Sequence, residues 1–147
     1  MNRESSIRPA RAGDFKRLLD WLRAAGLPTD DLTEAHMTQF LVLDRDDEPV
    51  GMIGLEALGD VALLRSLVVD KAARSAGAGR ELVVALEALA RQRGITELWL
   101  LTIDADAWFS RLGYAGRSRD DAPDTVRATR EFAGLCPDDA VLMSKTL

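Results

Sequence analysis

The sequence predicts an α/β fold built on a mixed sheet, and three observations support this. Apolar runs of strand length alternate with segments whose apolar residues recur at helical spacing. The run at 61–69 leads through a glycine-containing loop into a helix expected at 77–93. The run at 98–101 shows no alternation of apolar and polar residues, which is typical of a strand buried on both faces.

The first half of the chain is expected to begin with a strand at 6–9. The helix that follows can be capped by Asp14. Its apolar face carries Phe15, Leu18, Leu19, Leu22 and Ala25. The next segments are a turn at 26–28, a short helix at 32–37, a strand at 40–43 and a polar turn at 44–49.

The second half is expected to begin with a hairpin, in which strands at 50–58 and 61–69 are joined by Gly59 and Asp60. The remaining elements are a helix at 77–93, a strand at 98–101, a short helix at 104–112 ending at Gly113, a helix at 123–135 and a strand at 141–147. Pro123 suits the first turn of its helix.

Length and composition exclude several classes of protein. A chain of 147 residues predicts one domain, 1–147, with a real core. The net charge of −5, without a basic stripe, argues against a nucleic-acid partner. A single cysteine, Cys136, and a single histidine, His36, argue against disulfides and cysteine- or histidine-rich metal sites. No apolar run suits a membrane span or a signal core, so a cytoplasmic protein without a membrane or metal partner is expected.

The segment 74–79, Arg-Ser-Ala-Gly-Ala-Gly, lies between a predicted strand and a predicted helix. The first N–H groups of a helix lack internal partners, and the positive end of the helix dipole lies there. Together with Arg74 they make a site for an anion, most often phosphate. The alternative is a loop that only caps the helix.

Two motifs give the chain a family resemblance. Residues 74–79 match the R/Q-x-x-G-x-G/A motif of the GNAT N-acetyltransferase superfamily, and 108–114 resemble its second signature, F-Y-x-x-L-G-F. More narrowly, 63–69, 108–114 and 127–137 look like the arsenic-resistance N-acetyltransferases, the ArsN type. The resemblance implies the GNAT fold. This is a central mixed, mostly antiparallel sheet with helices on both faces and a splay between the fourth and fifth strands.

The resemblance also implies acetyl-CoA as the co-substrate. Amides of the glycine loop would hold the pyrophosphate, and the end of strand 61–69 would pair its backbone with the pantetheine arm. The residues to which the resemblance assigns acetyl-CoA binding are Leu67, Val68, Val69, Arg74, Ser75, Ala76, Gly77, Ala78, Gly79, Phe109 and Arg111.

Attack of an amine on a thioester needs a deprotonated amine, a donor for the oxyanion and an acid for the departing thiolate. Here the sequence departs from the family pattern. Phe109 stands where relatives carry the tyrosine that protonates the thiolate. Water, or release of CoA as the thiolate, would then serve. Arg65 and Leu63 stand where relatives carry the base, and neither can act as one.

The acceptor residues are expected on the hairpin. With a two-residue turn, Glu56 lies opposite Leu63 and shares a face with Arg65. Glu56 is therefore a candidate base or amine ligand, or simply the ion-pair partner of Arg65. Arg65 is a candidate clamp for a carboxylate, phosphinate or arsinate, or else a salt bridge that fixes the strand. Arg127 and Arg130 are a second candidate anion clamp, or a solvated ion-pair face.

These observations predict transfer of an acetyl group to the primary amine of a small anionic, amino-acid-like acceptor. By resemblance, the acceptor is an arsenic- or phosphorus-containing glutamate analogue, which would give resistance. The alternatives are an ordinary amino acid as acceptor and a non-catalytic acyl-CoA-binding sensor. Acetylation of lysine-rich protein tails is disfavoured by the arginines near the site. The sequence leaves a homodimer open.

Overall fold

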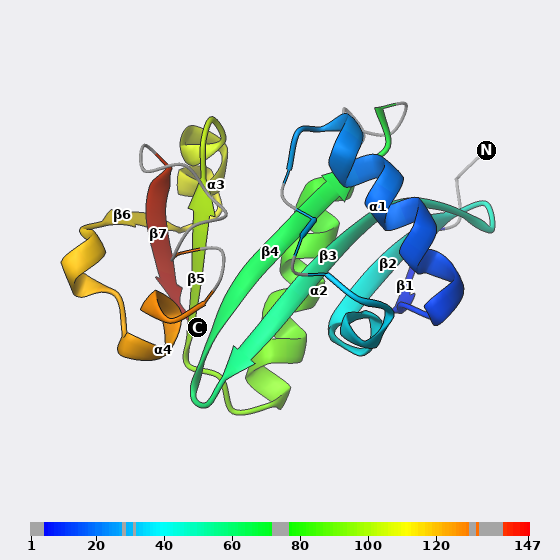
Figure 1. The fold of residues 1–147 in the computed structure, drawn as a ribbon. Coiled ribbons are helices and arrows are strands. Elements are labelled where there is room, and N and C mark those ends of the chain that lie inside the picture. Colours follow the sequence, from blue (N-terminus) through cyan, green and yellow to red (C-terminus); the bar gives the residue numbers. More distant parts are fainter. Residues whose placement is uncertain (1–4, 28, 31, 72–76, 130–131, 133–139) are drawn as a thin grey trace. The chain divides into compact units, whose positions relative to one another are not determined.

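The structure is a computed structural model that describes residues 5–27, 29–30, 32–71, 77–129, 132 and 140–147. Its elements in chain order are β1 Ser5–Pro9, η1 Ala12–Asp14, α1 Phe15–Ala24, η2 Glu34–Gln39, β2 Phe40–Arg45, β3 Glu48–Leu58, β4 Val61–Val69, α2 Ala78–Gln92, β5 Glu97–Thr102, α3 Asp106–Arg111, β6 Ala115–Arg117, η4 Arg119–Asp121, α4 Asp124–Arg127 and β7 Val141–Thr146. The predicted α/β class is confirmed (Figure 1).

The strands follow the order β1-β2-β3-β4-β5-β7-β6 in a seven-stranded sheet. Strands β1 and β2, β2 and β3, β5 and β7, and β6 and β7 pair antiparallel, whereas β4 and β5 pair in parallel. The parallel pairs join Val61–Leu63 to Glu97–Trp99, and among the described residues the ladder extends no further. The sheet is therefore mixed and mostly antiparallel, with the expected splay between the fourth and fifth strands.

The chain divides into two compact units. Unit 1 comprises Met1–Leu55 and Ser66–Ala88, and unit 2 comprises Glu56–Arg65 and Leu89–Leu147. The β3–β4 hairpin and helix α2 each contribute residues to both units.

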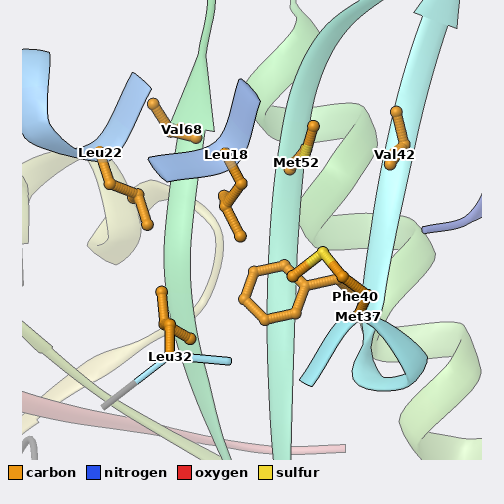
Figure 2. Close-up of a cluster of buried hydrophobic side chains, with 8 residues drawn as sticks. All are labelled: Leu18, Leu22, Leu32, Met37, Phe40, Val42, Met52 and Val68. Carbon is orange, nitrogen blue, oxygen red and sulfur yellow. The ribbon is translucent and has the colours of Figure 1, made fainter. Parts of the chain in front are cut away.

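One face of the strands in unit 1 is covered by α1 and η2. Figure 2 shows side chains from these elements, and Leu32 just before η2, together with side chains of β2, β3 and β4. The cluster is Leu18, Leu22, Leu32, Met37, Phe40, Val42, Met52 and Val68. Phe40 lies opposite Gly54 in the β2–β3 register. A Cβ on Gly54 would lie only 2.6 Å from the Phe40 ring, so this glycine makes room for the ring.

The opposite face in unit 1 packs against α2. Gly51 and Met52 are neighbours on β3 and face opposite sides. A Cβ on Gly51 would lie 2.8 Å from Leu82 of α2, so helix and strand approach closely there. Helices α1 and α2 consequently lie on opposite sides of these strands (Figure 1).

Arg8 of β1 ties together three segments of unit 1. Its Nε donates to Asp44 of β2 at 2.7 Å, and its two Nη atoms donate to the Asp14 carboxylate at 2.9 and 3.1 Å. Asp14 also accepts from the Arg11 N–H at 2.8 Å. The prediction that Asp14 caps α1 is wrong, because its side chain makes no cap bond to that helix and instead closes η1.

The core of unit 2 lies on β4, β5 and β7. It is formed by Val61, Leu63, Trp99, Ala122, Val126 and Leu142. The Arg117 guanidinium lies over the Trp99 ring, 5.1 Å from its centroid, and donates to Ser144 at 3.1 Å. The short β6 is thereby held to the core by a charged side chain.

Several predicted boundaries change. The helix expected at 123–135 is α4, which ends at Arg127; residues 130–131 and 133–139 of that range lie outside the described residues. The Thr129 hydroxyl donates to the Val126 carbonyl at 2.7 Å and accepts from the Phe132 N–H at 3.3 Å. The Thr129 side chain thus bonds to backbone groups next to the end of α4.

In the first half, the polar turn expected at 44–49 is much shorter. Strand β2 continues to Arg45, and the turn is formed by Asp46 and Asp47, both with positive φ. The second helix is 3-10 and runs Glu34–Gln39. His36 closes its start, because its Nδ1 accepts from the Thr33 N–H at 2.9 Å. Within the described part of the chain, every helix is too short or too polar to cross a membrane.

Asp14→Asn should lower the free energy of unfolding by about 1–2 kcal/mol at pH 7, because it removes a charge-assisted acceptor from Arg8. The hydrogen bonds from Arg8 hold the pKa of Asp14 below its ordinary value. The stabilisation is therefore complete above the unfolded pKa of about 3.9, and is lost as pH falls through the lower folded pKa. Urea unfolding at several pH values should show the two proteins converging below about pH 4. A difference that stays constant to pH 3 would contradict this.

Candidate functional site

The loop between β4 and α2 in unit 1 is the predicted phosphate site. Gly77 has φ of +78°, a left-handed conformation that favours glycine, and its carbonyl accepts the first helical bond of α2, from Glu81 at 3.1 Å. The N–H groups of Ala78 and Gly79 precede that bond and point out of the helix end. Arg74, Ser75 and Ala76 lie outside the described residues.

An acidic residue, Glu81, lies in the first turn of α2. By itself, its carboxylate would repel a bound phosphate. Its Oε1 is 2.8 Å from Nη2 of Arg45, a buried arginine at the end of β2. This ion pair offsets the carboxylate charge, so the helix N-terminus keeps its preference for anions.

At the end of β4, backbone groups rather than side chains are the candidate contacts for a ligand. Val68 is buried in the unit 1 core, while Leu67 and Val69 are half-buried. Their predicted role, backbone pairing with an extended arm, requires no particular side chain.

Strand β4 accommodates one extra residue at Ser66. The two-residue turn of the hairpin sets Gly54 opposite Arg65. Beyond it, the Asp70 N–H donates to the Val50 carbonyl at 2.7 Å, which is one residue out of step with that register. Ser66 lies between the two pairs with φ of +56°. We infer a β-bulge at Ser66.

The acceptor candidates Glu56 and Arg65 lie together in unit 2. The Arg65 Nη1 is 3.6 Å from the Glu56 Oε1. The Arg65 side chain is 4% exposed and that of Glu56 is 34% exposed. The structure confirms that they share a face. Their separation exceeds the 2.7–2.9 Å typical of a strong charge-assisted hydrogen bond.

The second candidate clamp is only partly described. Arg127 is the last residue of α4 and is exposed; its N–H donates to the Pro123 carbonyl at 3.0 Å. Arg130 lies outside the described residues. Arg127 is therefore placed at a helix end, where its guanidinium reaches solvent.

The second signature forms the end of α3 in unit 2. The Tyr114 N–H donates to the Phe109 carbonyl at 3.2 Å, and the Gly113 N–H donates to the Ser110 carbonyl at 3.1 Å. Gly113 has φ of +96°. These features define a Schellman motif, whose usual apolar contact is here made by the rings of Phe109 and Tyr114, 5.6 Å apart.

Phe109 is 6% exposed and packs edge-to-face on Trp108, with ring centroids 4.9 Å apart. It is a packing residue that cannot supply a proton. Arg111, also predicted to bind the cofactor, is exposed in the last turn of α3.

Two features were not expected from the sequence. Serine has no special preference for a left-handed conformation, so nothing marks Ser66 as the bulge. Lys145 of β7 bonds to the end of α3, 33 residues earlier in the chain.

The described residues contain no group of three or more histidine, cysteine, aspartate or glutamate side chains placed to hold a metal.

Comparison with known proteins agrees with this geometry. A family model described as the acetyltransferase (GNAT) family matches residues 6–114. An amino-acid acetyltransferase of Neisseria meningitidis is 28% identical, covering 83% of this chain and 30% of that protein. An uncharacterized N-acetyltransferase, CT2212, of Chlorobaculum tepidum is 27% identical, covering 98% of this chain and 97% of that protein.

A solved structure has the same fold. N-acetylglutamate synthase from Neisseria gonorrhoeae, complexed with coenzyme A and N-acetyl-glutamate, matches with a TM-score of 0.86 at 24% identity, over 100% of this chain and 36% of that chain. The chain spans less than a third of the length of the amino-acid acetyltransferases that it matches.

Ser66→Val should lower the free energy of unfolding by about 1–3 kcal/mol, because a β-branched side chain is strained at φ of +56°. The matched control is Ser6→Val in the exposed strand β1, where extended backbone suits valine and a change within about 0.5 kcal/mol is expected. Urea unfolding gives both values. Equal changes in the free energy of unfolding at the two positions would contradict the assignment of a β-bulge at Ser66.

Proposed function

Because the chain belongs to the acetyltransferase (GNAT) family, we propose that it transfers the acetyl group of acetyl-CoA to the primary amine of a small amino acid. The observation that carries the choice of acceptor is the Glu56–Arg65 pair. An amino acid presents a carboxylate and an ammonium close together. The pair presents the complementary charges, also close together, on one face of the hairpin.

The loose geometry of the pair favours exchange with such a ligand. A guanidinium can hold a substrate carboxylate with a bidentate bond, in addition to the contacts that Arg65 already makes. Glu56, which is partly exposed, is then free to accept the ammonium. Each charge of the pair keeps an opposite charge beside it in both states, so binding leaves no buried charge uncompensated.

The reaction is a direct transfer. The neutral amine attacks the thioester carbonyl carbon, the new C–N bond forms, and the C–S bond breaks to release CoA. The amine proton passes to Glu56 or to water. Phe109 cannot protonate the leaving thiolate, so CoA leaves as the thiolate or takes its proton from water. The N-terminus of α2 and the backbone of β4 hold the phosphate and pantetheine parts of the donor.

The acceptor class follows from the charges. Amino acids are the first acceptors to test, because similar proteins are amino-acid acetyltransferases. An arsenic- or phosphorus-containing glutamate analogue belongs to the same chemical class and would give a resistance role. Release of CoA should be measured with acetyl-CoA and a panel of amino acids, these analogues and uncharged amines. Turnover limited to amines that carry an anion supports the proposal, whereas CoA binding without turnover on any amine favours the sensor.

Arg65→Met should raise the KM for the anionic acceptor about 10- to 100-fold, because it removes a charge-assisted hydrogen bond but keeps most of the side-chain volume. The KM for acetyl-CoA should change less than about twofold. Arg91→Met, at an exposed arginine in the last turn of α2, is the matched control and should change neither. An unchanged acceptor KM in a folded Arg65 variant would remove Arg65 from the acceptor site.

If Glu56 takes the amine proton, Glu56→Gln should lower kcat most at low pH. At low pH the amine is mostly protonated, so the reaction depends most on a base that removes the proton. At high pH the free amine is abundant and the two rates should approach each other. Steady-state rates over a pH series with saturating acetyl-CoA give this comparison. A loss that is the same at every pH would assign Glu56 to binding the ammonium instead.

A further inference from the structure

The start of η2 is closed by a histidine. The Thr33 N–H donates to the His36 Nδ1 at 2.9 Å, and the Thr33 Oγ1 lies 3.2 Å from the same nitrogen. The His36 N–H donates back to the Thr33 carbonyl at 3.0 Å. His36 occupies the third position of η2, where a reciprocal cap of this kind usually has glutamate or glutamine. A ring nitrogen therefore takes the place of a carboxylate or amide oxygen.

The ring can accept this hydrogen bond only in its neutral form. An imidazole nitrogen accepts only when it carries no proton, so the bond requires the tautomer with the proton on Nε2. In the doubly protonated ring both nitrogens are donors, and the Nδ1–H would face the Thr33 N–H. Its positive charge would also lie at a helix start, which favours negative charge. Protonation therefore removes the bond that closes η2.

The surroundings of His36 offer little compensation for such a charge. Among the described residues, no ion pair joins the ring to a carboxylate. Glu34 lies in the first turn of η2. Strand β1 and η1 pack against η2, and there Arg8 and Asp14 pair with each other. The other charged side chains next to η1 and on α1, which shares the core cluster, are Arg11, Lys16, Arg17, Asp20 and Arg23, all exposed.

The segment 33–39, which contains η2, covers part of the unit 1 core. Leu32 precedes this segment and Met37 lies within it, and these residues are 8% and 2% exposed. Both belong to the cluster in Figure 2, together with Phe40, the residue at which η2 is capped. A helix of six residues is marginal by itself. Its few cap bonds therefore weigh heavily in how often the segment opens.

We propose that His36 makes the segment 33–39 a pH-sensitive strap: the neutral ring holds the strap closed over the unit 1 core, and protonation of the ring releases it. Histidine is the side chain that ordinarily changes charge between about pH 5 and 8, and this chain has only one. The strap lies wholly within unit 1. It needs neither acetyl-CoA nor an acceptor, so the free protein is enough to test it, whatever the outcome for the proposed function.

Amide hydrogen exchange followed by NMR measures the opening of the strap. Protection of the Thr33 and His36 N–H groups is corrected for the intrinsic exchange rate at each pH. It should fall about three- to tenfold between about pH 7.5 and 5.5, which is the effect of losing one cap bond. Leu86, in the middle of α2, is the internal control. Its protection should stay within about twofold.

Two variants separate the charge of the ring from the bond that it accepts. His36→Gln keeps a neutral acceptor at the third position, so its protection should match that of the original chain at about pH 7.5 and should not fall at about pH 5.5. His36→Ala removes the acceptor and should show the lower protection at both pH values. If the glutamine variant does not fold, His36→Glu takes its place, because a carboxylate remains an acceptor throughout this range.

The ring itself gives a second measurement. The nitrogen-15 chemical shifts of the two ring nitrogens distinguish the tautomers, and a single histidine leaves no ambiguity of assignment. At about pH 7.5 they should show the proton on Nε2 and none on Nδ1. As pH falls, the loss of Thr33 protection should have the same midpoint as the titration of the ring.

Three results would each overturn the proposal. The first is a ring with its proton on Nδ1 at about pH 7.5, since that nitrogen could not then accept from Thr33. The second is protection of the Thr33 N–H that stays constant while the ring titrates. The third is an equal fall of protection in His36→Gln, since the pH dependence would then come from another group.

Discussion

The extra residue in strand β4 is the constraint on which much of the structure depends. A shift of one residue in a strand moves every later side chain to the opposite face of the sheet. On the hairpin side of Ser66, the register places Arg65 on the face of Glu56. Beyond Ser66, the shifted register places Val68 in the core cluster with Met52. A β4 strand without the bulge would satisfy only one of these two requirements.

Much of the fold could be predicted, because the spacing of apolar residues along the sequence clearly indicates long helices and strands. Strands β3 and β4 and helix α2 follow it closely. It fails where charged residues are paired inside the structure: Asp44 and Arg45 resemble a turn, yet they continue β2 because Arg8 and Glu81 neutralise them. It also fails at β6, whose three residues are all exposed and carry no apolar pattern. That residues 1–147 act as one domain stays a prediction.

The candidate site likewise has features that could be predicted from the sequence and features that could not. The Glu56–Arg65 face was predictable, because a two-residue turn fixes the register of everything close to it. Ser66 and Lys145 were not. The left-handed conformation of Ser66 depends on how β4 pairs in the sheet, and the local sequence does not encode it. The Lys145 bond joins residues that are far apart in the chain and meet only in the folded protein. The cofactor-binding roles of Gly77 and Phe109 come from family resemblance and remain predictions, although the conformation of each fits its motif.

The Schellman motif at the end of α3 changes what the second signature means. Leu112, Gly113 and Tyr114 end a helix, and Phe109 packs on the tyrosine to close that end. These are folding requirements, which hold whether or not any chemistry takes place nearby. An aromatic ring at position 109 meets them with or without a hydroxyl. The signature is thus a marker of architecture, and the identity of the proton donor is a separate trait that evolution can alter while the helix stop is retained.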